Sequence, residues 1–293
     1  MARIETERLT KRYGEHRGIE DVSLSIEEGE VFGFIGPNGA GKSTTIRTLL
    51  GLLVPTSGTA TILGKRAADE PEWVFQRVGY LPADVRSYDR MRVGRFLELT
   101  AGFYEHDCSA RAKELVASFE IDETRRFGEL STGNKKKVGI VQCFMHRPDV
   151  IVLDEPTTGL DPLMQARFYE LLNGERDRGA TVLFSSHTLS EVQQQCSRIA
   201  IIRQGRIVES GPLAELRSRR VRRLRVTGSD RAVNRVAALS GVQIERSEAG
   251  RLICLYSGTP NDVIAALGGE QIADLLIEEP SLEEVFLHYY TEE

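Results

Sequence analysis

The chain has 293 residues, of which 41% are apolar and 28% charged, and its formal net charge is −5. This composition argues against intrinsic disorder, and the acidic balance argues against a surface that binds nucleic acid or anionic lipid as a whole. The length predicts one large domain and a smaller one. No segment has the roughly 18 apolar residues needed to span a bilayer, and the N-terminus lacks an apolar signal segment.

Residues 1–35 alternate apolar and polar side chains, which predicts strands joined by a turn at Glu28-Gly29. A helix is expected to begin near Lys42 and to end at Pro55 and Gly58. Apolar residues with the spacing of one buried helix face follow Lys42: Ile46, Leu49, Leu50 and Leu53.

Residues 88–130 have a helical pattern, clearest in "SARAKELVASFE". Two short apolar runs follow, "VIVL" at 150–153 and "TVLF" at 181–184, and each precedes a helical stretch. Such runs are typical of buried parallel strands. The alternation of strand and helix predicts a mainly parallel α/β sheet.

The segment "RIAIIRQGRIVESG" predicts a hairpin that turns at Gln204-Gly205, and "RSRRVRRLR" at 217–225 then contains six arginines. We place a domain boundary here, with a large domain over 1–216 and a small α+β domain over 217–293. The small domain is expected to contain a strand, a helix, a hairpin, a helix, a strand and a final helix from Ser281, where Glu284 completes a capping box. The arginine run could contact phospholipid headgroups or a nucleic acid. It lacks the interleaved aromatic residues needed for base stacking and it follows the proposed boundary, so a solvated connector and strand is favoured, with a headgroup contact as the alternative.

The stretch "GPNGAGKST" at 36–44 matches the phosphate loop G-x-x-x-x-G-K-[ST] and lies between a predicted strand and a predicted helix. Its glycines let backbone N–H groups surround a phosphate at the positive end of the helix. The nucleotide-binding candidates are Gly36, Pro37, Asn38, Gly39, Ala40, Gly41, Lys42, Ser43 and Thr44. Lys42 is expected to reach the β- and γ-phosphates and Ser43 to bind Mg²⁺.

An acidic pair, Asp154 and Glu155, directly follows the predicted strand at 150–153. Asp154 suits a Mg²⁺ ligand. Glu155 is expected to project toward the γ-phosphate, where a carboxylate orients and deprotonates an attacking water. An Asp-Glu pair after a strand is usually only part of a polar loop. Here the phosphate loop is also present, and catalysis therefore becomes the favoured interpretation.

These motifs, together with "LSTGN" at 130–134, "TTGLD" at 157–161 and "SSH" at 185–187, resemble the nucleotide-binding subunit of an ATP-binding cassette (ABC) transporter over about residues 3–215. The resemblance implies an α/β P-loop NTPase cassette with a mainly parallel sheet, an antiparallel β subdomain and a helical subdomain at about 85–145. The cassette would bind ATP and Mg²⁺ and hydrolyse ATP.

The same resemblance implies further roles. Tyr13 would stack on adenine, and His187 would contact the γ-phosphate and support Glu155 in catalysis. Ser131 and Gly133 would face the ATP of a second subunit, and Asp161 would lie in the loop that crosses between the two subunits. The two subunits would then pair head to tail, as a homodimer or a heterodimer.

Two departures from the family pattern concern the signature and a sensor loop. The signature is usually L-S-G-G-Q, but Thr132 and Asn134 stand here in place of a glycine and the glutamine. The position that commonly holds a glutamine in "VGYLPADVRSY" is Ala83, and the neighbouring Asp84 is a candidate substitute. The signature is followed by three lysines at 135–137. Successive residues of a helix point about 100° apart, so at most one of these lysines can face the nucleotide.

The C-terminal "EEPSLEEVFLHYY" resembles the tail of drug-resistance exporter ATPases. This implies a separate integral-membrane permease as partner and a cytoplasmic location, peripheral on the inner face of the membrane, with no nucleic acid expected. The alternative is a soluble ABC ATPase that acts on nucleic acid or ribosomes. Proteins of that soluble class usually have two cassettes in one chain or a long coiled-coil insert. This sequence has one phosphate loop and no sustained heptads, so the exporter is favoured.

Overall fold

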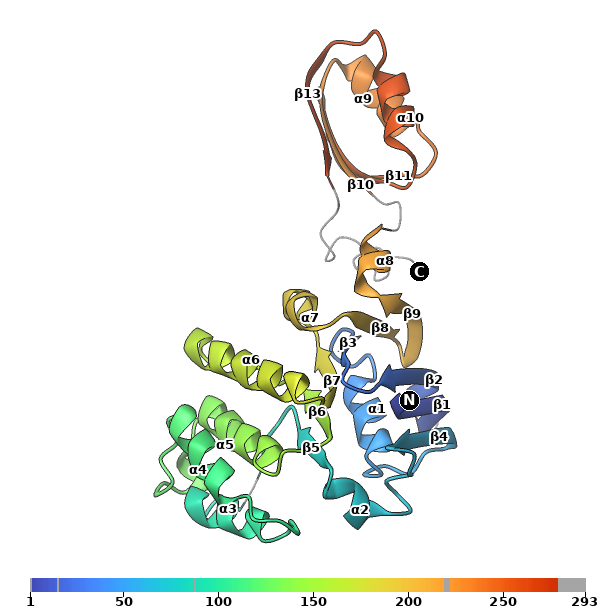
Figure 1. Ribbon diagram of the computed structural model, residues 1–293. Coiled ribbons are helices and arrows are strands. Elements are labelled where there is room, and N and C mark those ends of the chain that lie inside the picture. Colours follow the sequence, from blue (N-terminus) through green and yellow to red (C-terminus); the bar gives the residue numbers. More distant parts are fainter. Residues whose placement is uncertain (1, 15, 87, 219–221, 279–293) are drawn as a thin grey trace. The chain divides into compact units, whose positions relative to one another are not determined.

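The computed structural model describes the chain except residues 1, 15, 87, 219–221 and 279–293. It divides into two compact units, Met1–Gly211 and Pro212–Glu293 (Figure 1). Among the described residues, no helix combines the length and the apolar character needed to cross a membrane. The helix expected from Ser281 falls outside the described residues.

A six-stranded sheet forms the centre of the first unit. Its order is β5 (Val78–Leu81), β6 (Val150–Asp154), β7 (Thr181–Ser186), β3 (Val31–Ile35), β8 (Arg198–Arg203) and β9 (Arg206–Pro212). Strands β5, β6, β7, β3 and β8 are parallel, and every residue of β3, β6 and β7 is buried. The predicted parallel strands are therefore confirmed, and their apolar runs reflect burial on both faces.

A three-stranded antiparallel sheet packs beside it, in the order β2 (His16–Glu27), β1 (Ala2–Tyr13) and β4 (Ser57–Ile62). The predicted turn after Glu27 leads from β2 into β3, with Gly29 at φ 71°. Apolar residues from both sheets enclose the inner face of α1 (Lys42–Leu49). The phosphate loop thus starts and ends on buried elements.

Helix α1 is shorter than the sequence pattern predicts, because it ends at Leu49 rather than near Pro55. Gly51 adopts φ 71°, and the N–H of Leu52 donates to the carbonyl of Arg47 at 2.9 Å. A left-handed glycine directly after the last turn is a common helix terminator. Leu53 therefore lies outside the helix, and its place in the predicted helical stripe was wrong.

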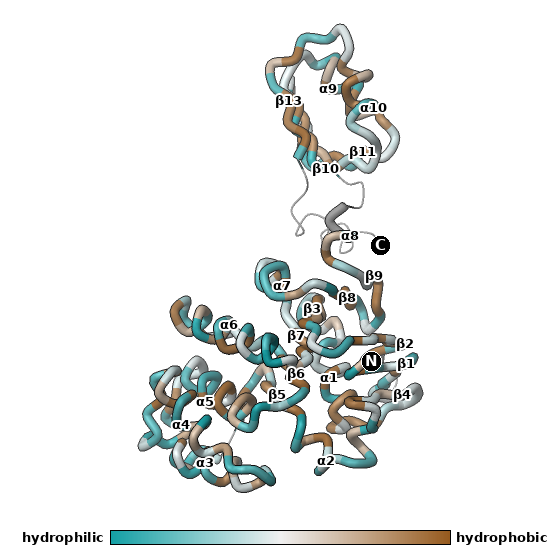
Figure 2. Tube along the Cα trace, in the orientation of Figure 1, coloured by the Kyte–Doolittle hydropathy of each residue, from teal (hydrophilic) through white to brown (hydrophobic). Residues whose placement is uncertain are grey.

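The remaining helices of this unit lie around the parallel sheet. They are α2 (Pro71–Phe75), α3 (Val93–Ala101), α4 (Ser109–Ser118), α5 (Thr132–Phe144), α6 (Pro162–Asp177) and α7 (Leu189–Gln195). Figure 1 shows α3, α4 and α5 gathered beyond β5, on the opposite side of the sheet from β1, β2 and β4. In Figure 2, α4 and α6 carry both hydrophilic and hydrophobic residues, as expected for helices with one buried face.

The second unit begins with α8 (Leu213–Ser218) and then forms an antiparallel sheet in the order β11, β12, β10, β13. Along the chain its elements are β10 (Arg222–Gly228), α9 (Asp230–Ala237), β11 (Val242–Glu248), β12 (Arg251–Tyr256), α10 (Pro260–Leu267) and β13 (Ile272–Glu278). Helices α9 and α10 pack on the sheet around Leu224, Val233 and Val263. The α+β class expected for this part is confirmed.

Candidate nucleotide-binding site

The phosphate loop connects the end of β3 to the start of α1. Gly39 and Gly41 adopt φ 80° and 114°, a region that L side chains rarely occupy. Helix α1 begins directly after Gly41, and no side chain caps it. Its first N–H groups and the positive end of its dipole therefore form an anion site at the loop.

The turn of the β8–β9 hairpin is hydrogen-bonded to the phosphate loop. The carbonyl of Ala40 accepts a hydrogen bond from the N–H of Gly205 at 2.8 Å, and the Gly205 carbonyl accepts one from Glu20 at 2.7 Å. A Cβ at Gly36 would lie 2.4 Å from the carbonyl oxygen of Ile202. Only glycine fits at that position, and the loop is fixed to the sheet at both ends.

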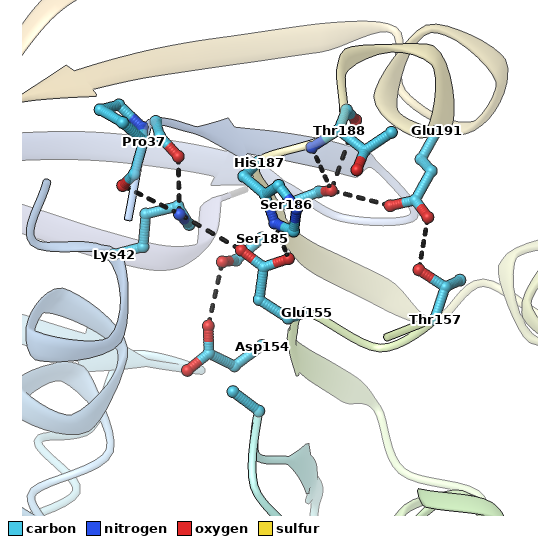
Figure 3. A network of polar contacts seen from close by, with 12 residues as sticks. Pro37, Lys42, Asp154, Glu155, Thr157, Ser185, Ser186, His187, Thr188 and Glu191 are labelled. Carbon is cyan, nitrogen blue, oxygen red and sulfur yellow. Dashed lines mark hydrogen bonds and ion pairs between the residues drawn. The ribbon is translucent and has the colours of Figure 1, made fainter. Parts of the chain in front are cut away.

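Lys42 is buried and contacts both the loop and Glu155 (Figure 3). Its Nζ donates to the carbonyls of Gly36 at 2.6 Å and Pro37 at 3.3 Å, and lies 3.2 Å from Oε1 of Glu155. The ammonium group is therefore held between the loop and the end of β6. From this position, the ammonium group of Lys42 can reach a phosphate that is bound in the loop.

Asp154, the last residue of β6, has the environment of a metal ligand. It is 0% exposed, and its Oδ1 accepts a hydrogen bond from Oγ of Ser185 at 3.1 Å. Its Oδ2 has no hydrogen-bond partner among the described residues. A buried carboxylate oxygen without a partner is costly, and an oxygen-ligated Mg²⁺ ion would satisfy it. Ser43, in the first turn of α1, offers a second oxygen, so the residues present fit Mg²⁺.

Glu155 and His187 form a contact pair next to Lys42 (Figure 3). Nδ1 of His187 lies 2.6 Å from Oε2 of Glu155, whose carboxylate is thus held between the histidine and the lysine. Glu155 has φ 51°, which is uncommon for a residue with a side chain and is typical of constrained functional positions. The sequence motifs predicted this grouping of Lys42, Asp154, Glu155 and His187, and the structure brings all four together.

A third carboxylate, Glu191 in α7, was not singled out in the sequence. It accepts hydrogen bonds from Oγ of Ser186 at 2.7 Å and from Oγ1 of Thr157. Ser186 directly precedes His187, and Thr157 lies two residues after Glu155, so Glu191 connects the segments at the ends of β6 and β7 (Figure 3). Its place in the first turn of a predicted helix after "SSH" was the only available signal.

Tyr13 lies at the end of β1, beside the phosphate loop. A Cβ at Gly18 would be 2.9 Å from Cε2 of the Tyr13 ring, and a Cβ at Gly41 would be 3.3 Å from the Gly18 carbonyl oxygen. Gly18 therefore separates the ring from the loop, and Tyr13 as a residue is 46% exposed. An exposed aromatic face next to a phosphate site is suitable for stacking on a purine.

The signature residues form a second cluster, at the N-terminal ends of α5 and α6. Ser131 caps α5 by accepting a hydrogen bond from Asn134 N–H at 3.3 Å, and Asp161 caps α6 by accepting one from Met164 N–H at 3.0 Å. A Cβ at Gly133 would lie 2.4 Å from the carbonyl oxygen of Gly159, so the two helix starts pack closely. Among the described residues, no hydrogen bond or ion pair joins Ser131 or Asp161 to the phosphate loop.

In the sensor loop, the carboxylate of Asp84 pairs with Arg86 at 2.7 Å and is mostly exposed. Asp84 therefore points toward solvent. The three lysines of the signature segment differ in environment, since Lys136 is buried whereas Lys135 and Lys137 are half-buried. Nζ of Lys135 lies over the ring of Phe127 at 5.8 Å.

The parallel sheet, the phosphate loop and the carboxylates at the end of β6 define a P-loop nucleotide-binding cassette. The family model described as ABC transporter matches residues 19–158. A relative in Nostoc sp., an uncharacterized ABC transporter ATP-binding protein, is 39% identical over 68% of this chain, and this chain spans only 61% of its length. The Nod factor export ATP-binding protein I of Burkholderia orbicola is 33% identical over 98% of this chain and 96% of its own.

A solved structure described as a dimeric bacterial ABC transporter cassette aligns with a TM-score of 0.65 and 25% identity, over 72% of this chain and 98% of that chain. The aligned share corresponds to a single cassette. The chain belongs to the ABC transporter family.

Proposed function

We propose that the chain hydrolyses ATP with Mg²⁺ and powers the export of a substrate through a separate membrane permease. The observation that carries this proposal is the Glu155 carboxylate, held between Lys42 at 3.2 Å and His187 at 2.6 Å, next to the buried Asp154. A carboxylate at that position is suited to act as general base for an attacking water.

Each residue has a distinct task in the proposed reaction. The loop N–H groups and Lys42 bind the phosphates and stabilise the charge that develops on the transferred phosphoryl group. Glu155 takes a proton from water as the water oxygen bonds to the γ-phosphorus, while the bond from the γ-phosphorus to the β–γ bridging oxygen breaks and ADP leaves. His187 holds the Glu155 carboxylate in register. A Mg²⁺ ion bound by Ser43 and Asp154 would neutralise part of the negative charge of the phosphates.

A pair of variants tests the assignment. Glu155→Gln removes the base but keeps the shape, so it should bind ATP normally and lose turnover by about 100-fold or more. Lys42→Ala should instead weaken ATP binding itself, because it removes a direct phosphate contact. Fluorescent-nucleotide titration and phosphate release would be measured on the purified chain. Normal hydrolysis by Glu155→Gln would rule out Glu155 as the base.

A permease partner is supported by an apolar pocket of about 780 Å³ between α2, α3 and α5. Its lining includes Trp73, Phe75, Tyr80 and Phe103, and the side chain of Phe103 is 77% exposed. An exposed aromatic at an apolar pocket is typical of an interaction site.

The export function of the full-length Burkholderia relative supports the exporter class, with the ATPase bound peripherally at the inner membrane face.

The partner proposal is tested by co-purification from detergent extract of the native host. Phe103→Asp should abolish recovery of a hydrophobic membrane protein with the tagged chain, because a charge would be buried in the contact. Val54→Asp is the matched control, since Val54 is 75% exposed and does not line the pocket. Recovery of ribosomes or DNA without a membrane protein would support the soluble alternative instead.

A further inference from the structure

Lys136, in the first half of α5, is a fully buried lysine. It is 1% exposed and is among the largest fully buried side chains of the described residues. Lysine is rarely buried to this degree, because its ammonium group loses hydration. A charge in such a place requires specific partners.

The partners of Lys136 are three backbone carbonyls. Its Nζ donates to Pro82 at 3.0 Å, Ala83 at 2.8 Å and Glu155 at 3.0 Å. An ammonium group has three N–H donors, so all of them are used. Burial lowers the pKa of Lys136 to about 8, while the nearby carboxylates of Asp154 and then Glu155 act in the opposite direction. Charge-assisted bonds of this kind are stronger than neutral ones.

These carbonyls belong to two neighbouring segments of the sheet. Strands β5 and β6 are parallel, with Leu81 opposite Leu153, so the loop at 82–84 and the carbonyl of Glu155 follow at the same edge. Lys136 connects both segments to α5. Its cation also lies close to the acidic pair at the end of β6 and partly compensates their charge.

The backbone of Glu155 is constrained from two directions. Its N–H donates to the carbonyl of Ser185 at 3.1 Å, and its own carbonyl accepts from Lys136. These bonds hold the residue at φ 51°, a conformation that requires support from its surroundings. The Glu155 carbonyl also accepts a hydrogen bond from the N–H of Thr158 at 3.4 Å, so the bond to Lys136 is one of three that fix the backbone from which the Glu155 side chain projects.

We propose that Lys136 is a positioning residue, which connects the 82–84 loop to Glu155 through its ammonium group and keeps the Glu155 carboxylate aligned for catalysis. Ala83 takes part through its carbonyl, so the connection needs no polar side chain at that position. Asp84 adds negative charge near Lys136, but its carboxylate pairs with Arg86, and among the described residues no hydrogen bond joins it to Lys136. This inference rests on the proposed ATPase function.

The test compares ATP hydrolysis by the purified full chain with the variants Lys136→Met, Lys136→Arg and Lys137→Met. Lys136→Met should lower kcat by about tenfold or more, as expected when a catalytic group is displaced by about 1 Å. Its KM for ATP should stay within about threefold, because the ammonium group does not touch the nucleotide loop. Lys136→Arg keeps the charge and donors and should retain at least about a third of kcat.

Lys137→Met, a half-buried neighbour on the same helix, should match the unmodified chain. Unchanged kcat in Lys136→Met would overturn the proposal, and so would parallel loss of ATP binding. If Lys136→Met does not fold, Lys136→Arg decides, and a folded but inactive arginine variant would refute the proposal. Absence of hydrolysis in the unmodified chain would instead contradict the proposed function, so the two failures are distinguishable.

Discussion

The position of Glu155 could be predicted from the sequence, whereas the environment of Lys136 could not. Glu155 could be predicted because the phosphate loop and the acidic pair are local motifs whose chemistry requires each other. The environment of Lys136 could not, because its three acceptors come from residues 82, 83 and 155. Helix periodicity allowed at most one of the three lysines to face the nucleotide, but it could not show that Lys136 is buried against carbonyls that follow the paired strands β5 and β6.

His146 leads to a prediction on stability. Its ring is buried and stacks on Tyr104 at 4.0 Å, and burial lowers the pKa of His146 to about 4. The unfolded chain takes up a proton near pH 6.5, whereas the folded chain does not until about pH 4. Stability should therefore be complete above pH 6.5 and fall as the pH drops to 4, by roughly 3 kcal/mol in total.

His146→Phe keeps the stacked ring and removes the titrating group. The free energy of unfolding, measured by denaturant titration, should therefore fall less steeply in the variant than in the unmodified chain between pH 7 and 4.5. A difference between the two proteins that stays constant with pH would contradict the prediction.

At the scale of elements, the ends of helices were harder to predict than their existence. The predicted strands at 150–153 and 181–184 were confirmed as β6 and β7, because runs of three or four consecutive apolar residues need burial on both faces. Helix α1 ended earlier than expected. Its pattern of apolar residues continues through Leu53, but Gly51 packs so closely against residues 67 and 68 that it determines the end.

Two glycines test this account of helix termination. Gly51→Ala should destabilise the protein by about 1–3 kcal/mol, because φ 71° is strained for alanine and its Cβ would lie 2.8 Å from the N atom of Ala68. Gly174→Ala, inside α6 with open space around the position, should stabilise it by about 0.5–1 kcal/mol. Chemical denaturation measures both, and equal effects would contradict the argument.

At the scale of the whole molecule, the phosphate-loop cluster and the signature cluster are separate, because no hydrogen bond or ion pair joins Ser131 or Asp161 to the phosphate loop among the described residues. We propose that two chains pair head to tail, so that Ser131 and Gly133 of one meet the ATP of the other. The similar solved cassette is described as dimeric, which supports the formation of a dimer.

The pairing predicts a specific effect of Ser131. With ATP, the Glu155→Gln variant should sediment as a dimer because it does not hydrolyse the bound nucleotide. Adding Ser131→Asp should leave it monomeric, since a carboxylate still caps α5 but repels phosphate. ATP affinity of the monomer should be unchanged. Ser109→Asp, at the exposed start of α4, is the control and should remain dimeric, whereas a dimer in Ser131→Asp would contradict head-to-tail pairing.

The sequence by itself determined the class of the protein and predicted the residues of its nucleotide site, because a phosphate loop, an acidic strand end and a histidine after a strand are short motifs with local causes. The tertiary structure decided where α1 ends, which lysine is buried and which carboxylate supports the site. Those properties depend on contacts between segments distant in the chain, and the spacing of residues along the sequence contains no record of which strands become neighbours.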